Sequence, residues 1–383
     1  MTTASGGKMR KTAHCWVLLS ACLAFSARAE DVRIAMVTGL SGPIAETAQE
    51  ITRVTRGYLD MVNAQGGVNG NRLVLVTRDD HYDPAKTAGL VEESITSDKA
   101  VALVNSAGTA QTIGVIKSRV LNRHKVPLVG VFSGSEAIRG AGAEEIFHTR
   151  ATYREEVMKI ARVASTLGMK RVAILYQEDA FGQGILQSVA AAEKELGLQV
   201  ILKAGYKPGA RDFAVQASAI RGAHPQTIFL LGVPDSAAQF MKSWDAPPGA
   251  AQIFALSFVT PKLLTDAAGE SRVRGVGISQ VVPNPNSTAI PLVKEFQDFA
   301  QSRFGLGVAL NPVALEGFLN IRLVVEAIRL AGPAPTSEKV MRSLASMQNY
   351  RLGGFPLDFS SQKRNGSSYL DIAVVGRNGK LLY

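Results

Sequence analysis

The sequence predicts an α/β protein built from two units, each a mostly parallel sheet covered by helices. The chain has 383 residues, which is too long for one ordinary domain and suits two. From residue 31 onward, short apolar runs alternate with helical patterns, the rhythm of parallel α/β folds. Near residues 149–151 this rhythm stops and restarts, which predicts a boundary between two units.

The first unit is predicted between residues 32 and 132. Strands are expected over residues 32–37, 73–77, 101–105 and 127–132, and helices over 46–64, 84–97 and 112–124. On the first of these helices Ile51, Val54 and Tyr58 share one face, which is typical of an amphipathic helix packed on a core. The strand runs are short and apolar, as expected for strands buried on both faces.

The second unit repeats the pattern from residue 154 onward. Strands are expected over residues 171–176, 200–204, 227–231, 252–256 and 277–282, and helices over 154–167, 182–196, 212–221 and 236–244. Long helices at 291–304 and 312–331 follow, and residues 352–383 read as strands and turns. The alternation again predicts a parallel sheet with helices on its faces.

Residues 1–29 resemble a cleaved secretory signal. Basic Arg10 and Lys11 precede an apolar stretch too short to span a bilayer, and the segment ends in an A-x-A pattern that predicts cleavage after Ala29. An alternative is a lipoprotein signal, which would leave Cys22 lipidated. Both cysteines, Cys15 and Cys22, lie in this segment, so cleavage after Ala29 leaves a mature chain without disulfide or thiolate chemistry.

Charge and composition exclude several classes of function. The formal net charge is +10, and four of the basic residues lie within the first 29 residues. The other basic residues are scattered along the chain. Nucleic-acid binding needs clustered cations, so no nucleic-acid partner is expected. After the signal, no run reaches the ~18 apolar residues of a membrane-spanning helix, so none is expected in the mature chain.

Small, hydroxyl-bearing segments follow two of the predicted strands. Ser106, Gly108 and Thr109 come after the strand at 101–105, and Ser133 and Ser135 come after the strand at 127–132. In open α/β sheets, ligands bind at the carboxyl ends of strands, and helix starts there attract anions. Plain N-capping of helices by Ser and Thr is the other interpretation, and the sequence leaves both open.

Other motifs do not support a cofactor, a metal or catalysis. The glycines at 39 and 42 have the spacing G-x-x-G, which lacks the turn glycines of a dinucleotide site. The stretch from Asp79 to Asp83 reads as a turn and helix cap rather than a metal site, because the other histidines show no ligand spacing. No nucleophile elbow, Walker loop or H-E-x-x-H pair occurs, so no enzyme activity is expected.

The chain resembles the branched-chain amino-acid (Leu/Ile/Val) type of periplasmic binding protein from residue 31 to the C-terminus. The matching segments are TGLSGP at 38–43, NAQGGVNG at 63–70, DD at 79–80 with YDP at 82–84, VPL at 126–128, Tyr176 with DAFGQG at 179–184, DF at 212–213, and ALEGF at 314–318. The resemblance implies two Rossmann-like lobes joined by three crossovers, near residues 149–151, 279–282 and 352–354, with a ligand cleft between them. Lobe one would hold residues 31–149 and 283–351, and lobe two residues 150–282 and 352–383.

The resemblance also implies site residues. Thr109, with Ser133 and Ser135, would hold a ligand carboxylate, and Phe181 would cover the ligand from lobe two. Amino-acid binders of this type hold the ligand ammonium with an acidic residue after a lobe-two strand. Here that place has Ser257 and Phe258, which puts amino-acid specificity in doubt. A small organic acid, aromatic or otherwise apolar in its body, is therefore the expected ligand.

The function implied is ligand capture for an ABC importer. The protein would close its lobes on a solute in the periplasm and deliver it to a membrane permease with its ATPase. A ligand-sensing subunit that presents the same fold to a receptor is the first alternative, and an α/β enzyme is the second. The protein is expected to be a monomer without cofactor or metal.

Overall fold

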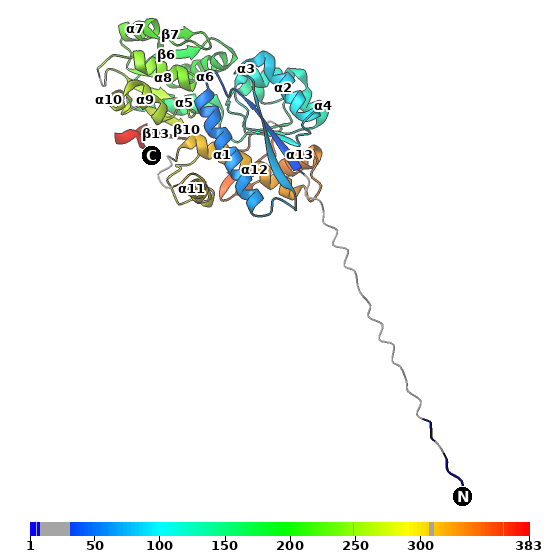
Figure 1. The fold of residues 1–383 in the computed structure, drawn as a ribbon. Coiled ribbons are helices and arrows are strands. Elements are labelled where there is room, and N and C mark those ends of the chain that lie inside the picture. The colour runs from blue at the N-terminus through cyan, green and yellow to red at the C-terminus, as the bar shows by residue number, and fades with distance from the viewer. Residues whose placement is uncertain (5, 8–30, 248, 306–309, 363) are drawn as a thin grey trace.

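The computed structural model describes residues 1–4, 6–7, 31–247, 249–305, 310–362 and 364–383, and its two α/β lobes lie side by side (Figure 1). Residues 8–30, which hold the predicted signal cleavage site, lie outside the described residues. The predicted fold class is confirmed, because each lobe is built on its own parallel-rich sheet.

The first lobe contains a five-stranded parallel sheet in the order β2-β1-β3-β4-β5. Its strands are β1 (Asp31–Thr38), β2 (Arg72–Asp79), β3 (Ala102–Val104), β4 (Leu128–Val129) and β5 (Ile146–Phe147). The helices between them are α1 (Ala45–Ala64), α2 (Pro84–Thr96), α3 (Thr109–Ser118) and α4 (Val120–His124). Strands β1, β3, β4 and β5 are almost wholly buried, whereas β2 at the edge of the sheet is mostly half-buried.

Two features of this lobe differ from the prediction. The single helix expected over 112–124 is two helices, because Arg119 adopts a left-handed conformation with φ 56° and separates α3 from α4. Strand β5 was not predicted, since two buried residues are too few to show a periodicity.

The second lobe contains a seven-stranded sheet in the order β14-β13-β10-β9-β8-β6-β7. Its parallel strands are β6 (Arg171–Gln177), β7 (Gln199–Tyr206), β8 (Thr227–Leu231), β9 (Gln252–Ala255) and β10 (Gly277–Gln280), and β13 (Asp371–Val375) and β14 (Leu381–Leu382) add antiparallel to its edge. The helices are α5 (Tyr153–Thr166), α6 (Ala180–Leu196), α7 (Ala214–Gly222), α8 (Pro234–Ser243), α9 (Pro261–Ala268) and α10 (Glu270–Val273).

Later segments return to the first lobe. These are α11 (Pro291–Phe304), α12 (Pro312–Leu330), α13 (Ser337–Ala345) and the hairpin of β11 (Tyr350–Leu352) and β12 (Phe355–Leu357). In Figure 1, α12 lies beside α1, although the two helices are far apart in the sequence. The ring of Tyr58 on α1 meets that of Phe318 on α12 edge to face at 4.9 Å, so these helices share one core.

The chain therefore passes between the lobes several times. The first passage is at residues 149–151, and the second follows β10, where Ile278 packs in the core of the second lobe and Val282 in that of the first. The third was expected near residues 352–354, but Leu352, Phe355 and Phe359 are buried in the core of the first lobe. The return to the second sheet is therefore later, at β13, because the hairpin buries its apolar residues in the first lobe. The lobe boundaries otherwise stay a prediction.

Candidate functional site

A cavity lies between the two lobes. From the first lobe it is lined by Thr38, Ile44, Thr47, Ala48, Ile51, Tyr82, Ala107, Gly108, Thr109 and Phe132, and from the second by Tyr153, Phe181, Val233, Pro234 and Phe258. Ile44 and Ala48 also pack in the core of the second lobe, so the lobes contact one another around the cavity. A molecule held here would touch both lobes.

Aromatic rings form the second-lobe wall of the cavity. The ring of Phe181 on α6 lies 5.3 Å from that of Tyr153 and 5.9 Å from that of Phe258, which follows β9. Tyr153 meets both phenylalanines edge to face or nearly so, an arrangement that aromatic pairs favour. All three side chains are buried, so this wall is apolar and preformed.

The polar side of the cavity is built around Thr109. Its Oγ1 lies 2.8 Å from Oγ of Ser133, and both side chains are buried. Helix α3 starts at Thr109, and its N-cap is Gly108, which has no side chain to satisfy the first backbone N–H groups. The capping interpretation therefore does not describe Thr109, whose hydroxyl faces Ser133. The start of α3 and the side chain of Thr109 thus lie at one end of the cavity, and Ser133 lies behind Thr109.

Gly108 is required by its surroundings. Its φ is 101°, and a Cβ at this position would lie 2.1 Å from Oε1 of Gln111. Gln111 in turn donates from Nε2 to the carbonyl oxygen of Tyr82 at 2.8 Å. Tyr82 and its neighbour His81 both have left-handed backbones, with φ of 59° and 55°. The glycine thus lets Gln111 hold a strained loop that places Tyr82 against the cavity.

The eight predicted site residues fall into two groups. Gly108, Thr109, Phe181 and Phe258 line the cavity, whereas Ser106, Ser133, Ser135 and Ser257 are not among its lining residues. Ser135 accepts a hydrogen bond from the backbone N–H of Ala137 at 3.3 Å. It therefore caps a three-residue 3₁₀ turn (η1, Glu136–Ile138) instead of the α-helix start that was expected. The assignment of ligand contacts stays a prediction.

The sequence interpretation missed a buried ionic cluster behind the aromatic wall. Arg150, in the first passage between the lobes, lies 3.5 Å from Glu156 of α5 and 3.6 Å from Glu316 of α12. Its guanidinium also donates to Oγ of Ser257. Arg150 and Glu156 are fully buried, and Glu316 is 2% exposed. One arginine thus contacts a helix of each lobe, and the hydroxyl of Ser257 is one of its hydrogen-bond acceptors.

The lining residues provide no charged side chain, since none of them is Asp, Glu, Lys or Arg. The Cζ of Arg150 lies 5.9 Å from the ring of Phe132 and 5.7 Å from that of Phe258. Both rings line the cavity, so this guanidinium lies on the far side of the wall. A charged group of a ligand would therefore rely on hydroxyls and backbone N–H groups.

Elsewhere in the described chain, one cluster has the residue types of a hydrolase triad. Oγ of Ser41 lies 2.6 Å from Nδ1 of His81, and the same nitrogen lies 3.2 Å from Asp79. A proton relay uses both ring nitrogens, one toward the serine and one toward the acid. Here both partners meet Nδ1, so the cluster is an exposed turn contact without the geometry of a triad.

The described residues contain no group of three His, Cys, Asp or Glu side chains that could hold a metal ion. Within them, every helix is either too short or too polar to cross a bilayer.

The chain is similar to known periplasmic binding proteins. The sequence profile described as "Periplasmic binding protein" matches residues 31–380. The crystal structure of a substrate-binding periplasmic protein from Ralstonia solanacearum is similar, with a TM-score of 0.86 and 33% identity, and the match covers 92% of this chain and 99% of that one.

Two curated relatives are more distant. An "Amino acid binding protein" of Pseudomonas aeruginosa is 24% identical over 250 residues, or 64% of this chain and 66% of that protein. A "Leu/Ile/Val-binding protein" of Escherichia coli K12 is 25% identical over 260 residues, or 66% of this chain and 70% of that protein. The chain thus matches about two thirds of the length of these curated relatives.

Proposed function

Because the chain belongs to the periplasmic binding protein family, a family of extracytoplasmic solute-binding proteins without enzyme activity, we propose that it captures a small carboxylate-bearing solute for an ABC importer. It would release this solute to a membrane permease driven by an ATPase. The Pseudomonas and E. coli relatives are named as amino-acid binders, which supports a ligand of that size with a carboxylate.

The observation that carries the choice of ligand is the chemistry of the cavity. Thr109, backed by Ser133, and the first turn of α3 offer donors at one end, and most of the other lining residues are aliphatic or aromatic. A carboxylate finds hydrogen-bond donors there, whereas an ammonium finds no carboxylate. An amino acid would leave its ammonium poorly paired, which costs at least ~2 kcal/mol, or more than tenfold in affinity. We therefore expect an organic acid with an apolar or aromatic body.

Capture would proceed by hinge closure. The cavity draws its lining from both lobes, so a bound solute stabilises the arrangement in which they meet. The lobes would separate to admit or release the solute by rotation about the passages that join them. Capture needs only one copy of the chain, and we expect a monomer.

Export is part of the same proposal. Cleavage after Ala29 would release a mature protein that begins at Glu30 into the periplasm. N-terminal sequencing of the protein from a periplasmic extract tests this, and a lipid-modified Cys22 would contradict it.

The ligand is tested by mass spectrometry of small molecules released from the purified protein. The proposal predicts an organic acid without an ammonium group. A panel of benzoate, phenylacetate and 4-methylpentanoate, each beside its uncharged amide, then tests binding by thermal shift. A ligand at a hundredfold excess over its Kd stabilises the folded protein by about 2.7 kcal/mol. Release of leucine, isoleucine or valine alone would contradict the proposed ligand class.

A further inference from the structure

Behind the aromatic wall of the cavity, the protein buries one arginine against two carboxylates. Arg150 lies 3.5 Å from Glu156 and 3.6 Å from Glu316, and all three side chains are almost completely inaccessible. A single guanidinium cannot neutralise two carboxylates. A buried charge without compensation is costly, and the usual response is that one carboxylate takes up a proton.

The hydrogen bonds indicate which carboxylate takes it. Oε2 of Glu156 accepts a hydrogen bond from the backbone N–H of Ser257 at 3.1 Å and another from Oγ of Ser279 at 2.6 Å. In the part of the chain that the structure describes, Oε1 of each glutamate has no hydrogen-bond partner, so the two bonds to Oε2 of Glu156 distinguish the pair. Donated hydrogen bonds stabilise a carboxylate, so Glu316 is the proton acceptor. Burial raises the pKa of Glu316 to about 7, with Arg150 opposing this rise and Glu156 adding to it.

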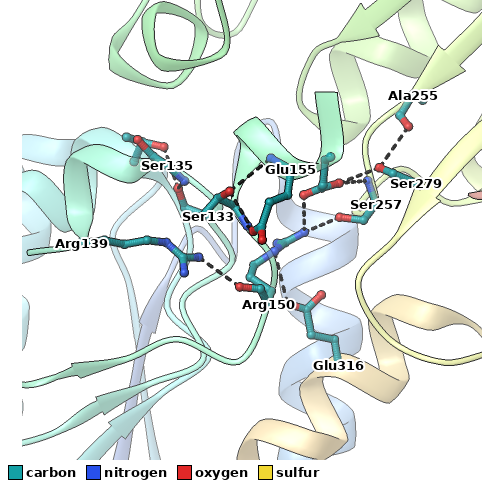
Figure 2. Close-up of polar contacts among 12 residues, drawn as sticks. Ser133, Ser135, Arg139, Arg150, Glu155, Ala255, Ser257, Ser279 and Glu316 are labelled. Carbon is teal, nitrogen blue, oxygen red and sulfur yellow. Dashed lines mark hydrogen bonds and ion pairs between the residues drawn. The ribbon is translucent and has the colours of Figure 1, made fainter. Parts of the chain in front are cut away.

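The other titratable groups around the cluster do not change this balance. Tyr153, at the start of α5, stays neutral because burial raises its pKa to about 12. Burial lowers the pKa of His148 well below its ordinary value, so this side chain is neutral too. Arg139 lies on the side of Arg150 away from Glu316 and donates to the backbone oxygen of Arg150 at 3.2 Å (Figure 2). The charges that face Glu316 are those of Arg150 and Glu156.

The cluster adjoins the cavity on two sides. The Arg150 guanidinium lies against the rings of Phe132 and Phe258, which line the cavity. Glu316 is followed in α12 by Gly317, where a Cβ would lie 3.1 Å from the side chain of Ile51, another lining residue. A charge that enters the cavity therefore interacts electrostatically with the cluster across a thin apolar wall, where screening by water is weak.

We propose that the site takes up its carboxylate ligand together with one proton, which Glu316 receives as the ligand enters. The inference rests on the proposed function, because it requires a ligand with a negative charge. The incoming carboxylate adds a negative charge beside a cluster that already has an excess of one. Protonation of Glu316 removes this excess and leaves Arg150 paired with Glu156. By linkage, affinity for an anion rises as pH falls through neutrality, while affinity for an uncharged ligand does not change.

Calorimetry measures this proton directly. The acid of the panel that binds most tightly (benzoate, phenylacetate or 4-methylpentanoate) is titrated at about pH 7.5 in two buffers that differ in ionisation enthalpy. The expected result is uptake of more than half a proton per acid bound, and an affinity about three- to tenfold weaker at pH 8.5 than at pH 6.5. The matching amide should bind without proton uptake. Binding of the acid without uptake would overturn this inference and leave the proposed function intact.

Two variants locate the proton. Glu316→Gln keeps the shape of the side chain and should abolish both the uptake and the pH dependence. Glu326→Gln removes a carboxylate from the same helix, where it is paired with Arg329 at the opposite end, and should leave both unchanged. Equal uptake by wild type and Glu316→Gln would overturn the assignment.

A ligand-free measurement tests the cluster when Glu316→Gln folds poorly or no acid binds. Infrared spectroscopy of the wild-type protein between pH 5 and pH 9 should show a protonated-carboxyl stretch that disappears near neutrality, about two units or more above an ordinary glutamate. Absence of this band would overturn the inference. If the band is present but no acid of the panel binds, the proposed ligand class fails and the coupling fails with it.

Discussion

Nε of Arg150 lies 3.6 Å from Oε1 of Glu316, so a buried ion pair connects the passage between the lobes to helix α12 of the first lobe. The same guanidinium lies 3.5 Å from Glu156 of the second lobe. Arg150 is thus a shared counter-charge for the two lobes, close to where they move relative to one another in the proposed closure.

Replacement of this arginine should be costly. Arg150→Met leaves Glu156 and Glu316 buried without a counter-charge, and we expect the free energy of unfolding at neutral pH to fall by about 3–5 kcal/mol. Urea denaturation measures the loss. Arg154→Met is the matched control, because Arg154 is exposed at the start of α5 and its loss should change stability by less than about 0.5 kcal/mol. Similar midpoints for the two variants would contradict a structural role for Arg150.

The stability of Glu316→Gln should depend on pH in a defined direction. The pKa of Glu316 is about 7 in the folded protein and near 4.5 when unfolded, so the folded state holds the proton more tightly. Glu316 therefore destabilises the wild type progressively as pH rises from about 4.5 to 7, by up to about 3 kcal/mol. The free energy of unfolding of Glu316→Gln should equal that of the wild type near pH 5 and exceed it at pH 8.

Titration of His148 changes stability with pH in the opposite direction, but it does so equally in the wild type and in Glu316→Gln. Its folded pKa lies well below 6.5, so it lowers stability as pH falls through that value. The difference between wild type and Glu316→Gln therefore isolates the glutamate. A difference that is constant from pH 5 to pH 8 would contradict the assignment.

The hydroxyl of Thr109 should matter for affinity. Thr109→Ala removes the partner of Ser133 and one donor to a ligand carboxylate, so affinity for the acid should fall about tenfold, equivalent to ~1.4 kcal/mol. Thr109→Ser keeps the hydroxyl and should keep most of the affinity. Calorimetry with the acid separates the two variants. An unchanged affinity in Thr109→Ala would show that this side chain is only structural.

Closure can be trapped covalently. A Cβ on Gly184 of α6 would lie 3.4 Å from Oγ of Ser135 in the first lobe, so the two positions face one another across the lobes. The Oγ atom stands close to where the Sγ atom of a cysteine at position 135 would lie, so two cysteines at these positions can approach one another closely enough for a disulfide. Ser135→Cys with Gly184→Cys should cross-link faster with a bound acid than without, and the oxidised protein should release the acid slowly. Each single variant is a control, and cross-linking that ignores the acid would argue against hinge closure.

The regular parts of the fold could be predicted because their patterns are local. The apolar run at 227–231 and the helix at 291–304 coincide with β8 and α11. The break at Arg119 escaped prediction because no glycine or proline marks it, although the residue is left-handed. The expected helix after Ser135 is a single 3₁₀ turn for which the sequence has no distinct signal.

The candidate site could be predicted only in part, for a physical reason. Gly108 and Thr109, which line the cavity, could be predicted because they lie in a small, hydroxyl-bearing segment directly after a predicted strand. Ligands of parallel α/β sheets bind at such strand ends. Arg150, Glu156 and Glu316 are brought together by the packing of two lobes, and charged residues on helices usually face solvent. One signal was available, because Glu316 interrupts an otherwise apolar stretch of α12, where a solvated side chain is not expected.

Calorimetry with leucine, isoleucine and valine against the panel of organic acids tests the central claim most directly. The cavity has donors for a carboxylate and, among its lining residues, no acid for an ammonium. We predict that at least one acid binds more than about tenfold more tightly than each of the three amino acids. Micromolar binding of leucine, with no acid of the panel binding more tightly, would contradict it.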